Sequence, residues 1–573
     1  MASYIESAIN NIYREDDDFI VLGLTGRTGS GCSTAAKILC SHQNEITHSL
    51  YSGDTPQTNN QRKEKIVRKD FERSWQKFTL IQVRSIITLL LLDKSPNETR
   101  HFFENKRQDI SKGAVRIFAD LATEYKKLNI KLQEEPLTND QFDFLFETLP
   151  SACELLKKNL SETLFVNLYQ QIGKNIRLSG DPYNADYVSG KFFTLAKKVY
   201  DVIEAGHIYN KSQKKKSYFV IDALRNPFEA LFFQDRYTSF FFVAISCSEQ
   251  DRQSRLNKYG YSLKDIETLD RNEYKPANID NESAYAIQDI QSCLQKADLY
   301  LSNPNIACKV DEFQWLANQL ITFVSLIRRP GLITPSHIER CMQIAHTAKL
   351  NSGCISRQVG AVVTDSNFSI QAVGWNDVPL GQVPCNLRNR IDLATGKDKS
   401  AYSEYEKNNL AYLNFFRAHT SKLIPIQEKG RNLSFCFKAE YNSFTKEKNQ
   451  VHTRSLHAEE NAFLQIAKHG GRKIAGGILF TTASPCELCA KKAYQLGISE
   501  IYFIDPYPGI AVEHILQGGS KNPKLTLFSG AIGRAFHKLY SPIVPYKDEL
   551  NALSPTMASG QPLGVTLLRK QHH

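Results

Sequence analysis

The first 330 residues show the alternation of short apolar runs and polar turns that is typical of an α/β domain. Four such runs predict buried strands, at residues 18–24, 218–222, 239–245 and 297–303. Between residue 71 and about residue 206, apolar positions recur with a helical period and are broken at proline-containing turns, which predicts a helical insertion. A helical pattern over 315–327 then ends at Pro330-Gly331, so we expect a domain boundary there.

The chain after this boundary predicts a second α/β domain, residues 331–573. It begins with a helix at Ser336 and contains a long polar insertion of about residues 388–453. Four strands are expected, at residues 359–363, 370–374, 477–481 and 501–504. Because the first two form a hairpin and helical patterns separate the others, the order predicts a three-layer α/β/α sheet domain.

The composition is that of an ordinary soluble protein with two or three domains in 573 residues: 42% of the residues are hydrophobic and 23% are charged. The longest dense apolar run, Ile86 to Leu92, is too short to span a membrane, and the polar N-terminus, Met1 to Asp18, does not resemble a signal peptide. We therefore expect a cytoplasmic protein without a membrane partner. The net charge of +11 permits anionic ligands without demanding nucleic acid.

Two short motifs in the second domain predict a catalytic zinc site. His457-Ala458-Glu459 is followed by Pro485-Cys486-Glu487-Leu488-Cys489, a combination that is typical of deaminases. Zinc in a hydrolytic site takes three protein ligands, here His457, Cys486 and Cys489, and leaves the fourth position to a water or hydroxide. Glu459 is not a ligand; we expect it to move a proton from this water to the substrate ring and then to the leaving ammonia.

The alternatives for these motifs are less specific. Of the twelve cysteines, Cys486 and Cys489 alone have ligand spacing, and such a pair also fits a redox couple or part of a structural zinc site with four ligands. The proline before Cys486 suits the first turn of a helix, where both sulfur atoms share one face. The full combination with His457 and Glu459 favours the catalytic interpretation.

A glycine-rich loop between the first predicted strand and a helix predicts a phosphate site in the first domain. Its candidate nucleotide-binding residues are Gly26, Gly29, Gly31, Cys32, Ser33 and Thr34, together with Asp222 at the end of a later strand. In P-loop proteins an aspartate in that place is linked to Mg²⁺, so a nucleotide with Mg²⁺ is the expected ligand. Cys32 stands where the P-loop lysine belongs, which favours nucleotide binding over phosphoryl transfer. The alternative is a plain α/β domain with an ordinary glycine turn.

The order of the first domain resembles the nucleoside- and nucleotide-kinase branch of P-loop folds. That resemblance implies that arginines after the strand at 239–245, Arg252 and Arg255, meet phosphates. The fold class expected for the whole chain is therefore α/β, with a P-loop nucleotide-kinase-like domain at residues 1–330 and the three-layer domain at 331–573.

The second domain resembles the deoxycytidylate deaminase family of the cytidine deaminase superfamily over about residues 336–510. The similar segments are Ser352 to Val362 (SGCISRQVGAV), Gly374 to Gly381 (GWNDVPLG), and the two zinc motifs. The resemblance implies deoxycytidine nucleotides as substrates, dCMP or dCTP, and a sugar contact by Asn376; the alternative for Asn376 is a turn residue that tolerates a positive φ angle.

The whole chain is similar to bacterial anti-phage dCTP/dCMP deaminases. This similarity implies depletion of deoxycytidine nucleotides during infection, a homo-oligomer, a regulatory nucleotide in the first domain and, in some members, restraint by a small RNA. Two other functions stay open. One is a polynucleotide deaminase acting on tRNA or single-stranded DNA, which shares the same zinc motifs. The other is a nucleotide-binding regulator whose deaminase domain is inert.

Overall fold

A computed structural model describes most of the chain, and all that follows concerns its described residues: 11–13, 17–94, 112–160, 162–274, 285–305, 313–423, 429–447, 449–470, 473–505 and 510–553. The chain divides into two compact units, Met1–Thr334 with Arg534–His573, and Pro335–Gly533. The sequence predicts that the polar N-terminal stretch is not a signal peptide. Most of this stretch lies outside the described residues.

The segment from Arg534 onward belongs to the first unit, whereas the sequence placed it with the second domain. Arg534 donates a hydrogen bond of 2.6 Å to the carbonyl oxygen of Phe240, and the amide of Gly331 donates one of 2.8 Å to the carbonyl oxygen of Leu539. These contacts join residues about 200 or 300 positions apart, so no local pattern indicates them.

Five strands of the first unit are parallel and lie in the order β5-β4-β1-β3-β2. Their bounds are β1 Phe19–Thr25, β2 Thr79–Gln82, β3 Ser217–Asp222, β4 Phe240–Ser246 and β5 Leu299–Ser302. The central strand β1 has a burial pattern typical of a parallel sheet covered on both faces. The carboxyl ends of β1 and β3 lie next to each other because Gly23 pairs with Ile221.

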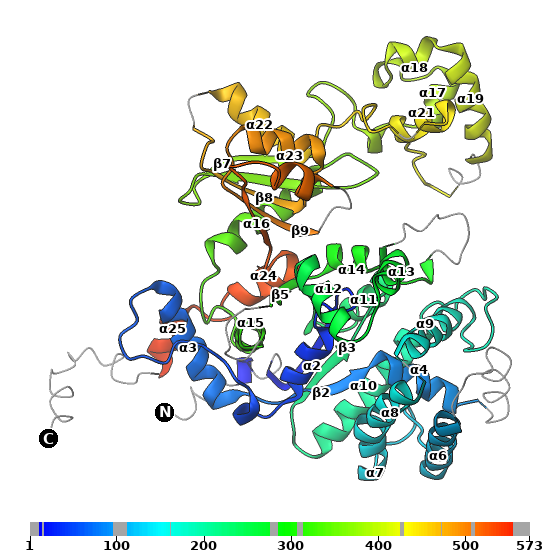
Figure 1. Ribbon diagram of the computed structural model, residues 1–573, viewed down its shortest axis with the longest axis vertical. Coiled ribbons are helices and arrows are strands. Elements are labelled where there is room, and N and C mark those ends of the chain that lie inside the picture. Colours follow the sequence, from blue (N-terminus) through cyan, green and yellow to red (C-terminus); the bar gives the residue numbers. More distant parts are fainter. Residues whose placement is uncertain are drawn as a thin grey trace. The chain divides into compact units, whose positions relative to one another are not determined.

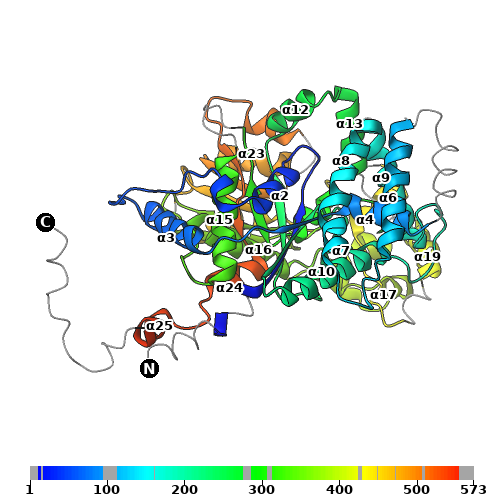
Figure 2. The same cartoon turned by 90° about the horizontal axis from the view of Figure 1, so that it is seen from below.

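Helices surround this sheet, and a group of them forms the predicted helical insertion. The helices of the first unit are α2 Cys32–Cys40, α3 Asn59–Ser74, α4 Val83–Leu92, α6 Lys112–Leu128, α7 Asn139–Asp143, α8 Leu149–Leu160, α9 Glu162–Ser179, α10 Thr194–Ser212, α11 Pro227–Gln234, α12 Glu249–Lys258, α13 Leu263–Tyr274, α14 Ile290–Lys296, α15 Gln314–Arg328, α24 Gly533–Tyr540 and α25 Tyr546–Leu553. Figure 2 shows α6, α7, α8 and α9 gathered in one group. The predicted insertion also contains strand β2, which the sequence analysis missed; residues 95–111 lie outside the described part.

The second unit contains a sheet in the order β10-β9-β8-β6-β7, and Figure 1 shows it with helices on its faces. Its strands are β6 Gly360–Thr364, β7 Ile370–Trp375, β8 Ile478–Ala483, β9 Glu500–Asp505 and β10 Lys524–Leu527, and its helices next to the sheet are α16 His337–Ala348, α22 Ala458–His469 and α23 Glu487–Gln495. Strand β6 is antiparallel to β7 and β8, whereas β8, β9 and β10 are parallel. All four predicted strands are present, and β10 is additional.

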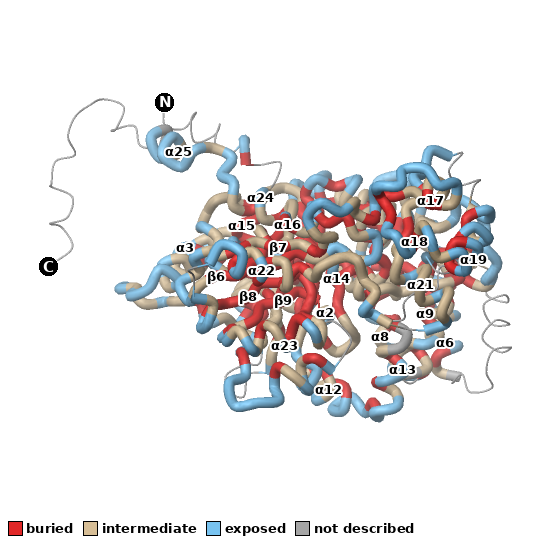
Figure 3. The backbone as a smooth tube through the Cα atoms, turned by 90° about the horizontal axis from the view of Figure 1, so that it is seen from above, coloured by how far each residue is buried: buried red, intermediate tan, exposed pale blue. Residues whose placement is uncertain are grey.

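Two glycines show that α16 and α22 cover opposite faces of this sheet. A Cβ atom at Gly360 would lie 1.9 Å from the carbonyl oxygen of Ala345 in α16, and one at Gly374 would lie 2.2 Å from that of Ala458 in α22. Gly374 pairs with Ala361, the neighbour of Gly360, so the two missing side chains would point to opposite faces. The predicted three-layer arrangement is present, and Figure 3 shows the buried residues along β8 and β9.

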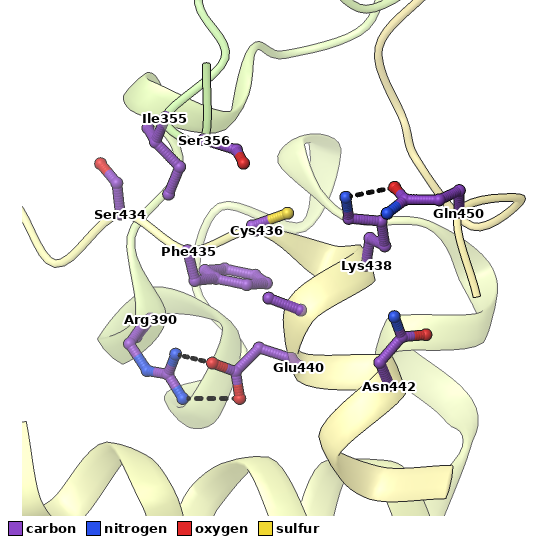
Figure 4. A pocket seen from close by; sticks show the side chains of 11 residues that line it. Ile355, Ser356, Arg390, Ser434, Phe435, Cys436, Lys438, Glu440, Asn442 and Gln450 are labelled. Atoms are coloured by element: carbon purple, nitrogen blue, oxygen red, sulfur yellow. Dashed lines mark hydrogen bonds and ion pairs between the residues drawn. The ribbon is translucent and has the colours of Figure 1, made fainter. Parts of the chain in front are cut away.

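The segment predicted as a polar insertion folds into a small helical subdomain with an apolar core. Its helices are α17 Arg390–Thr395, α18 Glu404–Asn408, α19 Leu410–Thr420 and α21 Phe437–Thr445. Tyr412, Phe416 and Phe435 are buried together, and a buried ion pair joins Arg388 to Glu406. A cavity of about 620 Å³ lies between this subdomain and the loop that carries Ile355, as Figure 4 shows.

Among the described residues, we find no helix that is both long and apolar enough to cross a membrane.

Candidate functional site

The three predicted zinc ligands lie together at the starts of two helices. His457 is the N-cap residue of α22, Cys486 is the N-cap residue of α23, and Cys489 lies in the first turn of α23. The Nδ1 atom of His457 is 3.2 Å from the Sγ atom of Cys486 and 3.4 Å from that of Cys489, and the three ligand atoms lie within 4.8 Å of one another. Tetrahedral zinc with bonds of about 2.0 and 2.3 Å separates its ligands by about 3.5 Å, so this donor set fits the ion.

The contact between the two cysteines shifts their pKa values in opposite directions. Hydrogen bonds from Cys489 and then His457 lower the pKa of Cys486 to about 3, whereas the bond to Cys486 and burial raise the pKa of Cys489. Zinc binds thiolates, so binding of the ion would release the protons that the two sulfur atoms still carry. A redox pair would not need a histidine against both sulfur atoms.

Glu459 lies on the first turn of α22 and has a buried carboxylate, with 4% of the residue exposed. Burial raises its pKa above the ordinary value. The hydroxyl of Thr481 in β8 lies at a long 3.5 Å from its Oε1 atom, while that hydroxyl donates at 2.8 Å to the carbonyl oxygen of Ala483. A buried carboxylate with a raised pKa and few bonds is suited to accepting and returning a proton.

Glu460 holds the two ligand-bearing helices together, a role that the sequence analysis missed. It forms a capping box with the N-cap residue His457 and an ion pair with Lys492 of α23. A glutamate at the third position of a helix after its N-cap is a recognisable signal, so the capping box was predictable. The contact with Lys492 was not, because it depends on how two helices pack.

The predicted sugar contact, Asn376, is bound on both ends of its amide. Its Oδ1 accepts from the amide of Val359 at 2.7 Å, and its Nδ2 donates to the carbonyl oxygen of Arg357 at 2.6 Å. It does not have the positive φ angle that the turn interpretation allowed. In the structure Asn376 braces the loop before β6, and the loop continues to Ile355 at the wall of the cavity in Figure 4.

The predicted glycine loop joins strand β1 to helix α2. Gly29 and Gly31 have φ angles of +89° and +113°, and Gly31 is the N-cap residue of α2 without a side-chain cap. A Cβ atom at Gly26 would lie 2.4 Å from the Oγ atom of Ser30. The loop therefore excludes side chains at these positions and begins a helix whose first amides have no side-chain acceptor.

The other predicted residues of this loop lie at the start of α2. Ser33 donates a hydrogen bond of 2.9 Å to the Oδ2 atom of Asp222, which brings together the two residue types that hold Mg²⁺ in P-loop proteins. Thr34 follows in the same turn. Burial raises the pKa of Cys32 to about 12, so its thiol is neutral and does not replace a lysine.

The two arginines expected to meet phosphates bind the loop backbone instead. Arg252 donates to the carbonyl oxygen of Thr28 at 3.2 Å, and Arg255 donates to that of Ser30 at 3.4 Å. The resemblance to kinases suggested ligand contacts, but the structure gives both arginines a supporting role.

Comparison with known proteins assigns the second unit to a class. A family model described as "Cytidine and deoxycytidylate deaminase zinc-binding region" matches residues 335–505, which include all three candidate zinc ligands. The deoxycytidylate deaminase of Enterobacteria phage T2 is 30% identical over 169 residues, which cover 29% of this chain and 78% of the phage protein. The chain thus belongs to the deoxycytidylate deaminase family.

Two further proteins are similar over the same region. The deoxycytidylate deaminase of Schizosaccharomyces pombe is 28% identical over 180 residues, covering 31% of this chain and 40% of the yeast protein. The crystal structure of the dCMP deaminase from the cyanophage S-TIM5 in apo form aligns with 34% of this chain and 100% of its own, at 21% identity and a TM-score of 0.21.

Proposed function

We propose that the protein removes the amino group of deoxycytidine nucleotides, dCMP or dCTP, by zinc-dependent hydrolysis. The observation that carries the proposal is the cluster of His457, Cys486 and Cys489 beside the buried carboxylate of Glu459. The relatives named deoxycytidylate deaminases support the choice of substrate.

The residues around this cluster have separate tasks. His457, Cys486 and Cys489 would hold zinc, which supplies a polarised water at neutral pH. Glu459 takes a proton from the water and gives it to the ring nitrogen; it then takes the proton of the new hydroxyl on the ring carbon and gives it to the amino group, which leaves as ammonia while the carbonyl forms. Burial raises the pKa of the Glu459 carboxyl. This brings its acidity closer to that of the groups with which it exchanges protons, which favours each proton transfer. Asn376 keeps its predicted sugar contact as part of this proposal, and it would have to exchange one of its two loop bonds for the substrate.

The test is a product assay on purified protein by mass spectrometry, with dCMP, dCTP and a single-stranded oligonucleotide as separate substrates. We expect dUMP or dUTP. Turnover of the oligonucleotide alone would show a polynucleotide deaminase. Full activity after Glu459→Ala would contradict the proposed chemistry, and no turnover of any substrate by zinc-loaded protein would favour the inert regulator.

We further propose that the loop Gly26–Thr34 binds the phosphates of a regulatory nucleotide, with Ser33 and Asp222 placed for Mg²⁺. Two positive φ angles, uncapped helix amides and the contact between Ser33 and Asp222 support this proposal. The neutral thiol of Cys32 favours binding without transfer, so ATP turnover should be slow or undetectable. Rapid release of phosphate from ATP by the wild-type protein would contradict this proposal.

The biological role belongs to the same proposal. The similarity to anti-phage deaminases suggests that the enzyme depletes deoxycytidine nucleotides in the cytoplasm. It would act as a homo-oligomer controlled by the nucleotide in the loop and, as in some of those deaminases, by a small RNA. Size-exclusion chromatography with light scattering, and dCTP levels in infected cells with and without the gene, would test these points.

A further inference from the structure

An internal carboxylate lies on the phosphate loop. Glu273, at the end of α13, is fully buried. Both of its carboxylate oxygens are 3.2 Å from the amide nitrogen of Thr28, and the hydroxyl of Thr28 donates to Oε1 at 2.5 Å. Arg225 donates to the same oxygen at 2.6 Å. A loop amide, a hydroxyl and a guanidinium are the donors that a phosphate group uses, and here a glutamate takes all three.

The loop has donors on one side and bound carbonyls on the other. The carbonyl oxygens of Thr28 and Ser30 accept hydrogen bonds from Arg252 and from Asn303, the latter at 2.8 Å. Because the carbonyl and the following N–H of a trans peptide point in opposite directions, the amides of Gly29 and Gly31 turn away from these side chains. The backbone of the loop is therefore held in a shape that can bind an anion, and the bonds that hold it do not involve Glu273.

Arg225 offers the positive charge that the loop lacks at Cys32. It follows Asp222 by three positions, and it also donates to the hydroxyl of Thr28 at 3.1 Å. Burial lowers the pKa of Arg225, but the carboxylate of Glu273, and then Cys32 and Asp222, raise it by more, so the guanidinium stays charged beside the loop residue Thr28. No lysine of the loop competes with it, and its charge is at present matched by Glu273.

We propose that Arg225 is the phosphate-binding cation of this site and that Glu273 is a built-in competitor which the phosphate chain of a ligand must displace. This inference rests on the proposed function of the loop and extends it to two residues outside the motif. The ligand class is a nucleoside di- or triphosphate, because a chain of phosphates can replace the carboxylate on Thr28 while it follows the amides to α2.

A second contact of α13 makes this displacement feasible. Asp270, one turn before Glu273, accepts from Arg252 at 2.8 Å with both oxygens and from Arg27 at 2.6 Å. These bonds keep α13 attached when Glu273 leaves the loop. Ligand binding therefore needs a rearrangement at the end of one helix and not the detachment of the helix.

The experiment measures binding of inorganic tripolyphosphate and of ATP by calorimetry, on the full chain. Glu273→Gln keeps the shape of the side chain and removes its charge, so we expect at least about 10-fold tighter binding of tripolyphosphate than in the wild type. Glu267→Gln, on the exposed side of the same helix, is the matched control and should bind like the wild type. Adding Arg225→Gln to Glu273→Gln should remove the gain.

The outcomes separate this inference from the proposed function. If the wild type binds ATP but Glu273→Gln binds no tighter, Glu273 is not a competitor of the ligand, and the proposed phosphate site stands. If Arg225→Gln leaves the gain intact, the assignment of the cation is wrong. If neither the wild type nor Glu273→Gln binds either probe at millimolar concentration, both proposals fail.

A measurement on the wild type covers the case in which Glu273→Gln does not fold. Hydrogen–deuterium exchange with and without ATP should show slower exchange in the loop and faster exchange at the end of α13, because Glu273 loses its bonds. Slower exchange in both segments would overturn the displacement.

Discussion

The candidate zinc cluster of the second unit and the proposed phosphate loop of the first unit both use the starts of helices, yet they differ in how their groups are assembled. His457 and Cys486 are N-cap residues, and Cys489 follows one turn later, so two short segments supply the whole zinc donor set. At the loop, the charged groups come from the ends of α13 and β3 as well as from the motif. The first site is contained in its motifs, whereas the second depends on residues far from its motif.

The physical reason is the range of the interactions. Metal–ligand bonds are short and directional, so three atoms within 4.8 Å define the site almost alone. Phosphate binding adds many weaker contributions from amides and charges, so a lysine can be lost from the motif if an arginine takes over its charge from another element. Substitutions at the two sites should therefore differ in the size of their effects and in which of the two activities, zinc binding or nucleotide binding, they leave intact.

The largest effect is expected from Cys489→Ser. Loss of one of three ligands should reduce bound zinc to well below one equivalent and abolish turnover of dCMP, because the activated water is lost with the ion. Metal analysis and the product assay measure both. Cys436→Ser, a free cysteine of the insertion, is the control and should keep zinc and activity. Full zinc content with full activity in Cys489→Ser would contradict the ligand assignment.

Glu459→Gln should lower turnover by roughly 10² to 10⁴-fold while zinc content stays at the wild-type level, because the proton carrier is lost and the ligands remain. This separation of chemistry from metal binding distinguishes Glu459 from the cysteines. Glu513→Gln, an exposed glutamate of the same unit, should be neutral. Loss of zinc together with activity would mean that Glu459 acts through the metal site's structure.

Gly31→Ala should weaken ATP binding by at least about 10-fold and leave zinc content unchanged. A Cβ atom there would lie 2.2 Å from the Nδ2 atom of Asn303, in a backbone with φ of +113°. Gly260→Ala provides the matched control, because Gly260 also has a positive φ angle, +83°, but nothing within 4 Å of its missing side chain. Equal ATP affinity in the wild type and Gly31→Ala would contradict the assignment of this loop as a phosphate site.

The smallest effect is expected from Lys492→Met, which breaks the ion pair with Glu460 between α22 and α23. Both side chains are partly exposed, so zinc affinity in competition with a chelator should fall only a few-fold. Lys491→Met, its exposed neighbour, should change nothing. A loss as large as that of Cys489→Ser would show that the pair, and not the ligands alone, builds the site.

Much of the fold could be predicted from periodicity, and the failures have local causes. The four strands predicted in the second unit are present, whereas β2 and β10 were missed because each has only four residues, too few to show a period. Strand β2 also continues directly into α4, whose apolar residues hide the boundary. The insertion was predicted to be polar, but aromatic residues such as Phe416 and Phe435 form a core that only folding brings together.

The sequence alone determined the candidate zinc ligands, the candidate proton carrier Glu459 and the glycine positions of the proposed phosphate loop, because each depends on neighbours within a few residues of a helix start. The tertiary structure alone decided that Asn376 braces a loop, that Arg252 and Arg255 hold backbone carbonyls, and that Glu273 lies on the amide of Thr28. Those contacts join segments up to about 250 residues apart, and the packing that creates them leaves no local pattern in the chain.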